Sequence, residues 1–113
     1  MAGHGLSLVR IAQLEIAPES LDAYRALLAE EIDATARHEP GVRMLYALSV
    51  REAPTRITII EVYADDTAYR AHLSAPHFIS YKTATEGMVR SLRLLEADPV
   101  AAFVRVNQSP SAP

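Results

Sequence analysis

The alternation of hydrophobic and polar residues along the chain predicts four strands. A turn at residues 51–55 joins the second strand to the third and favours a hairpin. The fourth strand alternates more loosely and is closed by Pro99. The predicted strands are Leu6 to Ile16, Val42 to Val50, Arg56 to Ala64 and Met88 to Ala97.

A long amphipathic helix is predicted between the first two strands. It begins near Pro18, which suits a first helical turn, and ends near His38 because Pro40 and Gly41 follow. Glu30 and Glu31 are assigned to its solvated face. Its apolar face carries Leu21, Tyr24, Leu28, Ile32 and Thr35 at helical spacing.

Two short helices are predicted after the third strand. Asp65 or Asp66 can cap the first of them, which ends near Leu73. The break at residues 74–76 opens the second, which runs from His77 into the region of residues 83–85.

The order strand, helix, strand, strand, short helices, strand predicts an α+β, ferredoxin-like split βαβ fold with an antiparallel four-stranded sheet. Helices would cover one face of that sheet, so its other face needs a second copy of the chain. We therefore expect a homodimer. Residues 1–113 form one predicted domain with its core at about 6–99, a flexible tail at 107–113, and an apolar segment at 100–106 that packs on the partner subunit.

Composition narrows the possible partners and locations. The chain has 113 residues, a formal charge of −3 and no basic run, so nucleic acid is not an expected partner. It has no cysteine, which excludes disulfides, thiolate catalysis and cysteine-ligated zinc. No apolar stretch suits a signal peptide or a membrane span, which predicts a cytoplasmic protein.

Four side chains at one strand–helix corner are the candidate catalytic residues: Glu61, Tyr63, His72 and His77. Glu61 lies on an apolar strand face, where burial would raise its pKa and suit it to act as a base. Its alternative role is structural, as the partner of a histidine such as His72. His72 is either a base or a residue that caps its helix, and His77 either faces a pocket or lies on the surface.

Aromatic residues supply the candidate substrate-binding walls. Phe78 and Tyr81 are three residues apart and share a helical face. Tyr46 is either a pocket wall or part of the core beside Met44 and Leu48.

No metal site is predicted. His72 and His77 would lie about 140° apart on a continuous helix, so they do not form the one-face histidine pair of zinc motifs. The sequence offers no obvious third ligand, and His4 and His38 are assigned to the surface.

Three segments together resemble the antibiotic biosynthesis monooxygenase (ABM) family: Glu39 to Val42, Ile60 to Asp65 and His72 to Phe78. Residues 81–85 and 88–92 are similar to a bacterial subgroup of it that includes candidate quinol monooxygenases. The resemblance covers roughly Leu6 to Pro99. Many members carry tryptophan where Tyr63 stands, and the absence of tryptophan disfavours the haem-degrading branch of the superfamily.

The resemblance implies a dimeric α+β barrel with a pocket in each subunit, between the sheet and the helices. It also implies a monooxygenase that needs no cofactor and oxidises a small quinol or polyketide-like aromatic compound with O₂. Two other functions stay open: an acid–base isomerase of a small dicarbonyl compound, and a non-catalytic dimer that binds a small molecule.

Overall fold

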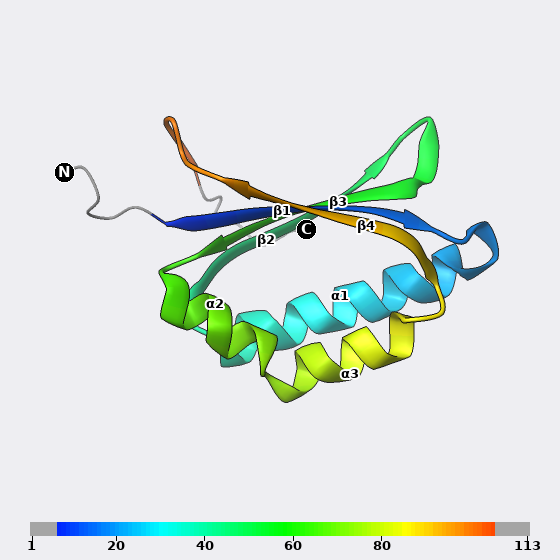
Figure 1. The fold of residues 1–113 in the computed structure, drawn as a ribbon, viewed down its shortest axis with the longest axis horizontal. Helices are drawn as coiled ribbons and strands as arrows, with labels where there is room; N and C mark the ends of the chain where they lie inside the picture. The colour runs from blue at the N-terminus through cyan, green and yellow to red at the C-terminus, as the bar shows by residue number, and fades with distance from the viewer. Residues whose placement is uncertain (1–6, 106–113) are drawn as a thin grey trace, which may run out of the picture.

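The computed structural model describes residues 7–105, and its elements follow the predicted order (Figure 1). His4 and the predicted tail at residues 107–113 lie outside the described residues. The elements are β1 (Leu8–Ile16), the 3₁₀ helix η1 (Pro18–Ser20), α1 (Leu21–His38), β2 (Val42–Val50), β3 (Ala53–Tyr63), α2 (Asp66–Leu73), α3 (Pro76–Thr85) and β4 (Val89–Ala97).

The four strands form one antiparallel sheet in the order β2-β3-β1-β4. This is the ferredoxin-like topology predicted from the sequence. The helices lie together on one side of the sheet, with α1 and α3 side by side beneath it (Figure 1). Among residues 7–105, no helix is long and apolar enough to cross a membrane.

The third strand begins at Ala53, three residues earlier than predicted, and therefore includes Pro54. Proline has no backbone N–H to donate to a neighbouring strand, so it is not expected where a strand is paired on both sides. The pairing of β3 with β1 extends only to Arg56, opposite Glu15, so Pro54 lies beyond it. The hydroxyl of Ser49 donates to the carbonyl oxygen of Pro54 at 2.8 Å and helps to close this end of the hairpin.

The inner face of the sheet packs on α1 and forms the core. Ala12 and Leu14 of β1 lie beside Ile57 and Ile59 of β3, and all four side chains are buried. Tyr24, predicted to be core, is fully buried among them. Burial of an aliphatic side chain of this size contributes about 1.5–3 kcal/mol, so this layer fixes the helix on the sheet.

The outer face of the sheet is also largely apolar. One row across it joins Tyr46, Ile60, Ile11 and Leu95, one residue from each strand. None of these four side chains is fully buried by the described part of the chain.

The N-termini of the short helices α2 and α3 are stabilised by a capping aspartate and by a proline in the first turn, respectively. Asp65 caps α2, since its Oδ1 accepts a hydrogen bond from the backbone N–H of Ala68 at 2.8 Å. The chain then breaks at Ser74, and Pro76 occupies the first turn of α3, where its missing N–H costs nothing. This break changes the direction of the chain between His72 and His77.

Candidate functional site

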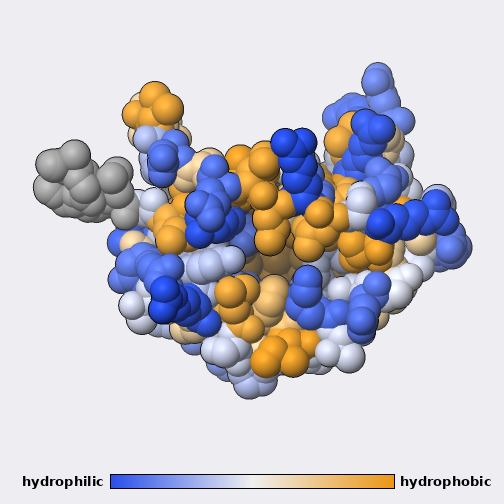
Figure 2. All heavy atoms as spheres, viewed as in Figure 1, coloured by the Kyte–Doolittle hydropathy of each residue, from blue (hydrophilic) through white to orange (hydrophobic). Residues whose placement is uncertain are grey.

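A cavity of about 200 Å³ lies between the inner face of the sheet and the helices. Figure 2 shows hydrophobic residues gathered around a hollow between these two layers. Most of the cavity wall is apolar and comes from all four strands and all three α-helices. Its polar and aromatic hydrogen-bonding residues are Arg10, Glu31, Glu61, Tyr63, Tyr69, His72, Tyr81 and Lys82.

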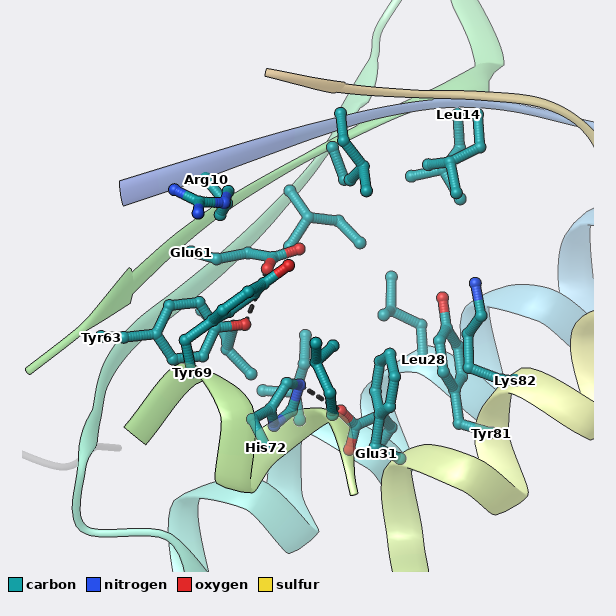
Figure 3. Close-up of a pocket in the computed structure, with 18 residues that line it drawn as sticks. Arg10, Leu14, Leu28, Glu31, Glu61, Tyr63, Tyr69, His72, Tyr81 and Lys82 are labelled. Atoms are coloured by element: carbon teal, nitrogen blue, oxygen red, sulfur yellow. Dashed lines mark hydrogen bonds and ion pairs between the residues drawn. The ribbon is translucent and has the colours of Figure 1, made fainter. Parts of the chain in front are cut away.

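Glu61 and Tyr63 form a hydrogen-bonded pair on β3. They are two residues apart, so the pleat of the strand places both on its inner face. The hydroxyl of Tyr63 donates to Oε1 of Glu61 at 2.7 Å, and the carboxylate of Glu61 points into the cavity (Figure 3). Tyr63 itself is fully buried.

Burial controls the ionisation of this pair. It raises the pKa of Glu61, as predicted, although the hydrogen bond from Tyr63 and the charges of His72, Arg10 and Lys82 oppose the rise. Burial and the neighbouring carboxylate raise the pKa of Tyr63 well above its usual value. Tyr63 therefore remains a hydrogen-bond donor at all physiological pH values.

His72 lines the cavity, but its hydrogen bonds differ from those predicted. It does not pair with Glu61. Its Nδ1 lies 3.1 and 3.2 Å from the two carboxylate oxygens of Glu39, and its Nε2 lies 3.5 Å from Oε2 of Glu31. The ring is 3% exposed. A carboxylate therefore lies close to each ring nitrogen of His72.

His77 lies outside the cavity. Its Nε2 hydrogen-bonds to Glu39, and its side chain faces a smaller hollow between α1 and α3. The structure therefore brings three of the four predicted catalytic side chains to the cavity wall: Glu61, Tyr63 and His72.

Two of the three predicted aromatic walls are present. Phe78 packs against His72 with ring centroids 4.6 Å apart, and both Phe78 and Tyr81 line the cavity. Tyr81 also shares a 2.6 Å hydrogen bond with Tyr24, and burial raises the pKa of both hydroxyls. This bond ties α3 to α1 behind the cavity.

Tyr46, expected to be either a pocket wall or part of the core, lies outside both the cavity and the core of the described chain. Tyr46 pairs with Ile60, whereas its neighbour Leu45 pairs with Glu61. Because adjacent residues of a strand point to opposite faces, Leu45 lines the cavity and Tyr46 lies on the outer face, 57% exposed.

Five residues of the candidate site were not identified from the sequence. Glu31 is 6% exposed rather than solvated, and it follows Tyr24 and Leu28 by seven and three residues, so helical spacing alone places it on the buried face. Glu39 belongs to a segment that carries the family resemblance, but nothing in its spacing predicts its contacts with His72 and His77. The other three are cavity residues: Arg10, Tyr69 and Lys82.

Arg10 had a signal that was available in the sequence. It alternates with Ala12 and Leu14 on β1, so it shares their inner face, directly opposite Glu61. Its guanidinium lies 4.8 Å from the ring centroid of Tyr69, a cation–π contact. Arg10, from β1, and Lys82, from α3, thus bring positive charge to the cavity that Glu61 also lines (Figure 3).

Comparison with known proteins agrees with this geometry. The sequence profile described as "Antibiotic biosynthesis monooxygenase" matches residues 7–84. No curated protein matches the chain significantly.

The chain is similar to many solved structures, of which three are described below. A candidate antibiotic biosynthesis monooxygenase from Bacteroides thetaiotaomicron shares 42% identity over 89% of this chain and 96% of that one, with a TM-score of 0.85. A candidate monooxygenase from Lactobacillus acidophilus shares 25% identity over 85% of this chain and 45% of that one, with a TM-score of 0.80. A candidate antibiotic biosynthesis monooxygenase from Nitrosomonas europaea shares 17% identity over 88% of this chain and 96% of that one, with a TM-score of 0.80, and supports the fold alone.

Proposed function

Because the chain belongs to the antibiotic biosynthesis monooxygenase family, we propose that it oxidises a small quinol or polyketide-like aromatic compound with O₂ and without a cofactor. The observation that carries the proposal is the carboxylate of Glu61, which is partly buried, faces an apolar cavity, is oriented by Tyr63 and is made more basic by its surroundings. These properties suit a general base.

The reaction balances without another reductant. A hydroquinone and O₂ give a hydroxyquinone and water, so the substrate supplies all the electrons. O₂ does not react readily with a neutral closed-shell phenol, but a phenolate can transfer an electron to it. The protein must therefore remove a proton and stabilise the anion that results.

Glu61 is the proposed base. Tyr63 occupies Oε1 and leaves Oε2 of the carboxylate for the hydroxyl of the substrate. Once the phenol is deprotonated, the positive charges of Arg10 and Lys82 favour the anion. His72 is no longer a candidate base because both ring nitrogens contact carboxylates, and His77 can affect the substrate only through Glu39 and His72.

The cavity suits a small aromatic compound. A protein cavity of roughly 150 Å³ holds benzene, so the space of about 200 Å³ here suits a substituted single ring. The rings of Phe78 and Tyr81 can stack on it.

The proposed assembly is a homodimer in which the outer faces of two sheets meet. The largely apolar row through Tyr46 and Ile60, with no helix on that side, supports this arrangement. The exposed apolar residues Val100 and Phe103 beyond β4 are a second proposed contact with the partner.

Oxygen consumption with a panel of small hydroquinones tests the function. We expect uptake above spontaneous autoxidation that persists in protein freed of metal by a chelator. Glu61→Gln should lower the rate roughly 10²–10⁴-fold, the usual contribution of a general base. Glu30→Gln is the matched control, because Glu30 is an exposed glutamate on α1, and its rate should equal that of the wild type.

A wild-type rate equal to autoxidation on the whole panel would contradict the oxygenase proposal. Proton exchange at a substrate carbon without O₂ would then indicate the isomerase alternative. A Glu61→Gln variant with full oxygenase activity would contradict the assignment of the base alone.

A further inference from the structure

We propose that Glu39, His72 and His77 bind a divalent transition-metal ion of the zinc class, behind the wall of the cavity. One ligand atom from each residue lies within 4.8 Å of the other two. Two imidazoles and a carboxylate are a common ligand set for Zn²⁺, Co²⁺ and Ni²⁺.

The distances suit such an ion. A tetrahedral metal with bonds of about 2.0–2.1 Å holds its ligand atoms roughly 3.3 Å apart. Nδ1 of His72 already lies 3.1 Å from Oε2 of Glu39, and Nε2 of His77 contacts the same oxygen. Small side-chain rotations would open the space for an ion between them.

The break between α2 and α3 makes the site possible. On one continuous helix His72 and His77 would point about 140° apart. Here His72 is near the end of α2 and His77 near the start of α3, and Glu39, the residue after α1, lies between their rings. The 140° separation therefore does not apply to these two histidines, and Glu39 is a third potential ligand.

A second carboxylate orients His72. Oε2 of Glu31 lies 3.5 Å from Nε2 of His72, and its Oε1 accepts a hydrogen bond from the hydroxyl of Thr35 at 2.9 Å. A histidine that donates Nε2–H to a carboxylate presents the lone pair of Nδ1, which is the usual arrangement around a protein metal ion. Glu31, Thr35 and His72 are all buried.

The charges also favour a cation. Glu31 and Glu39 are largely buried, and within residues 7–105 their ion pairs are with the two histidines alone. Two buried carboxylates need compensating positive charge. A divalent cation bound between Glu39 and the two histidines would supply it.

The site is separate from the proposed reaction. Glu39 and His77 do not line the cavity, and His77 faces the hollow between α1 and α3, where water can fill a fourth position. The ion would join the end of α1 to α2 and α3 and thereby hold His72 and Phe78 in the cavity wall. It takes no part in the oxidation.

Metal titration of the untagged, chelator-treated protein tests the proposal. Zn²⁺ at a hundredfold excess over its Kd should raise Tm by roughly 10 °C. Co²⁺ should bind at one equivalent and give the visible absorption of a tetrahedral site. His77→Ala and Glu39→Gln should each abolish both signals, and circular dichroism should show that they remain folded.

His38→Ala is the matched control. His38 is an exposed histidine whose ring centroid lies 6.2 Å from that of His77, and its loss should leave Zn²⁺ and Co²⁺ binding unchanged. The proposal is overturned if the wild type shows neither a Tm shift nor one-equivalent Co²⁺ binding. It is also overturned if His77→Ala binds as the wild type does, since the ion then lies elsewhere.

Discussion

Glu61 occupies a position where the pattern of β3 would otherwise place another aliphatic residue, after Ile57 and Ile59. A buried carboxylate costs free energy unless it is hydrogen-bonded, and Tyr63 offsets part of that cost. The remainder appears as the raised pKa of Glu61. The raised pKa that suits Glu61 to its proposed role as a base and the cost of Glu61 to stability therefore have the same physical origin.

Glu61→Gln should be at least as stable as the wild type at pH 7. The raised pKa means that the folded state holds the proton of Glu61 more tightly than the unfolded state does. As pH rises from the unfolded pKa of 4.5 through the folded pKa, the wild type should lose stability relative to the variant, which still accepts the bond from Tyr63. Below that window the difference should be constant.

Urea unfolding of both proteins across a pH series, at one protein concentration, checks this. The groups that act on Glu61 are Tyr63, His72, Arg10 and Lys82, and they are the same in both proteins. A difference that does not change with pH would mean that the pKa of Glu61 is ordinary.

Helix α2 depends on close contact with the residues before β2. It has eight residues, too few for a stable isolated helix, so its position is fixed by its cap and its packing. A Cβ on Gly41 would lie 2.7 Å from Cβ of Ala68, so only glycine permits this approach. The carbonyl of Gly41 also accepts from the N–H of Ala64 at 2.8 Å, which fixes the turn into α2.

Gly41→Ala should therefore lower the free energy of unfolding by about 1–3 kcal/mol, as overpacked sites do. It should also displace α2 and with it His72. Gly87→Ala is the control, because its Cβ would meet nothing within 4 Å. Denaturant unfolding of both variants measures the difference, and equal stabilities would show that α2 tolerates a shift at no cost.

The whole molecule is a sheet with helices on one side. Its outer face carries larger apolar residues along β2 than the inner face does, since Met44, Tyr46 and Leu48 lie outside while Leu45 and Ala47 lie inside. A monomer with that face in water would be poorly soluble. This asymmetry is the physical basis of the proposed dimer.

Tyr46→Glu should shift the protein from dimer to monomer, because it would place a charge in the middle of an apolar contact. Sedimentation velocity at micromolar concentration measures the change. Ile79→Glu is the control, since Ile79 is similarly exposed, at 51%, but lies on α3. A monomeric wild type, or equal dissociation in both variants, would contradict the proposed interface.

The sequence was sufficient for the fold because alternation and helical spacing are local properties. They located every strand and placed Glu61 and Tyr63 on one face. They could not give the partner of His72, because Glu39 is 33 residues away and the contact depends on how helices pack. Tyr46 was assigned to the core because it shares a strand face with Met44 and Leu48, but the pairing of β2 with β3 places that face on the side away from the helices.

The cavity is built from two parts that can vary independently. Glu61 and Tyr63 both lie on β3, which is paired with β1 on one side and β2 on the other. The spacing of their side chains is therefore set by the sheet and not by any helix. Phe78, Tyr81 and Lys82, which face them, all belong to α3. Substitutions in this single ten-residue helix could thus reshape the cavity while the Glu61–Tyr63 pair stays intact. Under the proposed function, related chains could then differ in substrate without any change in the proposed base.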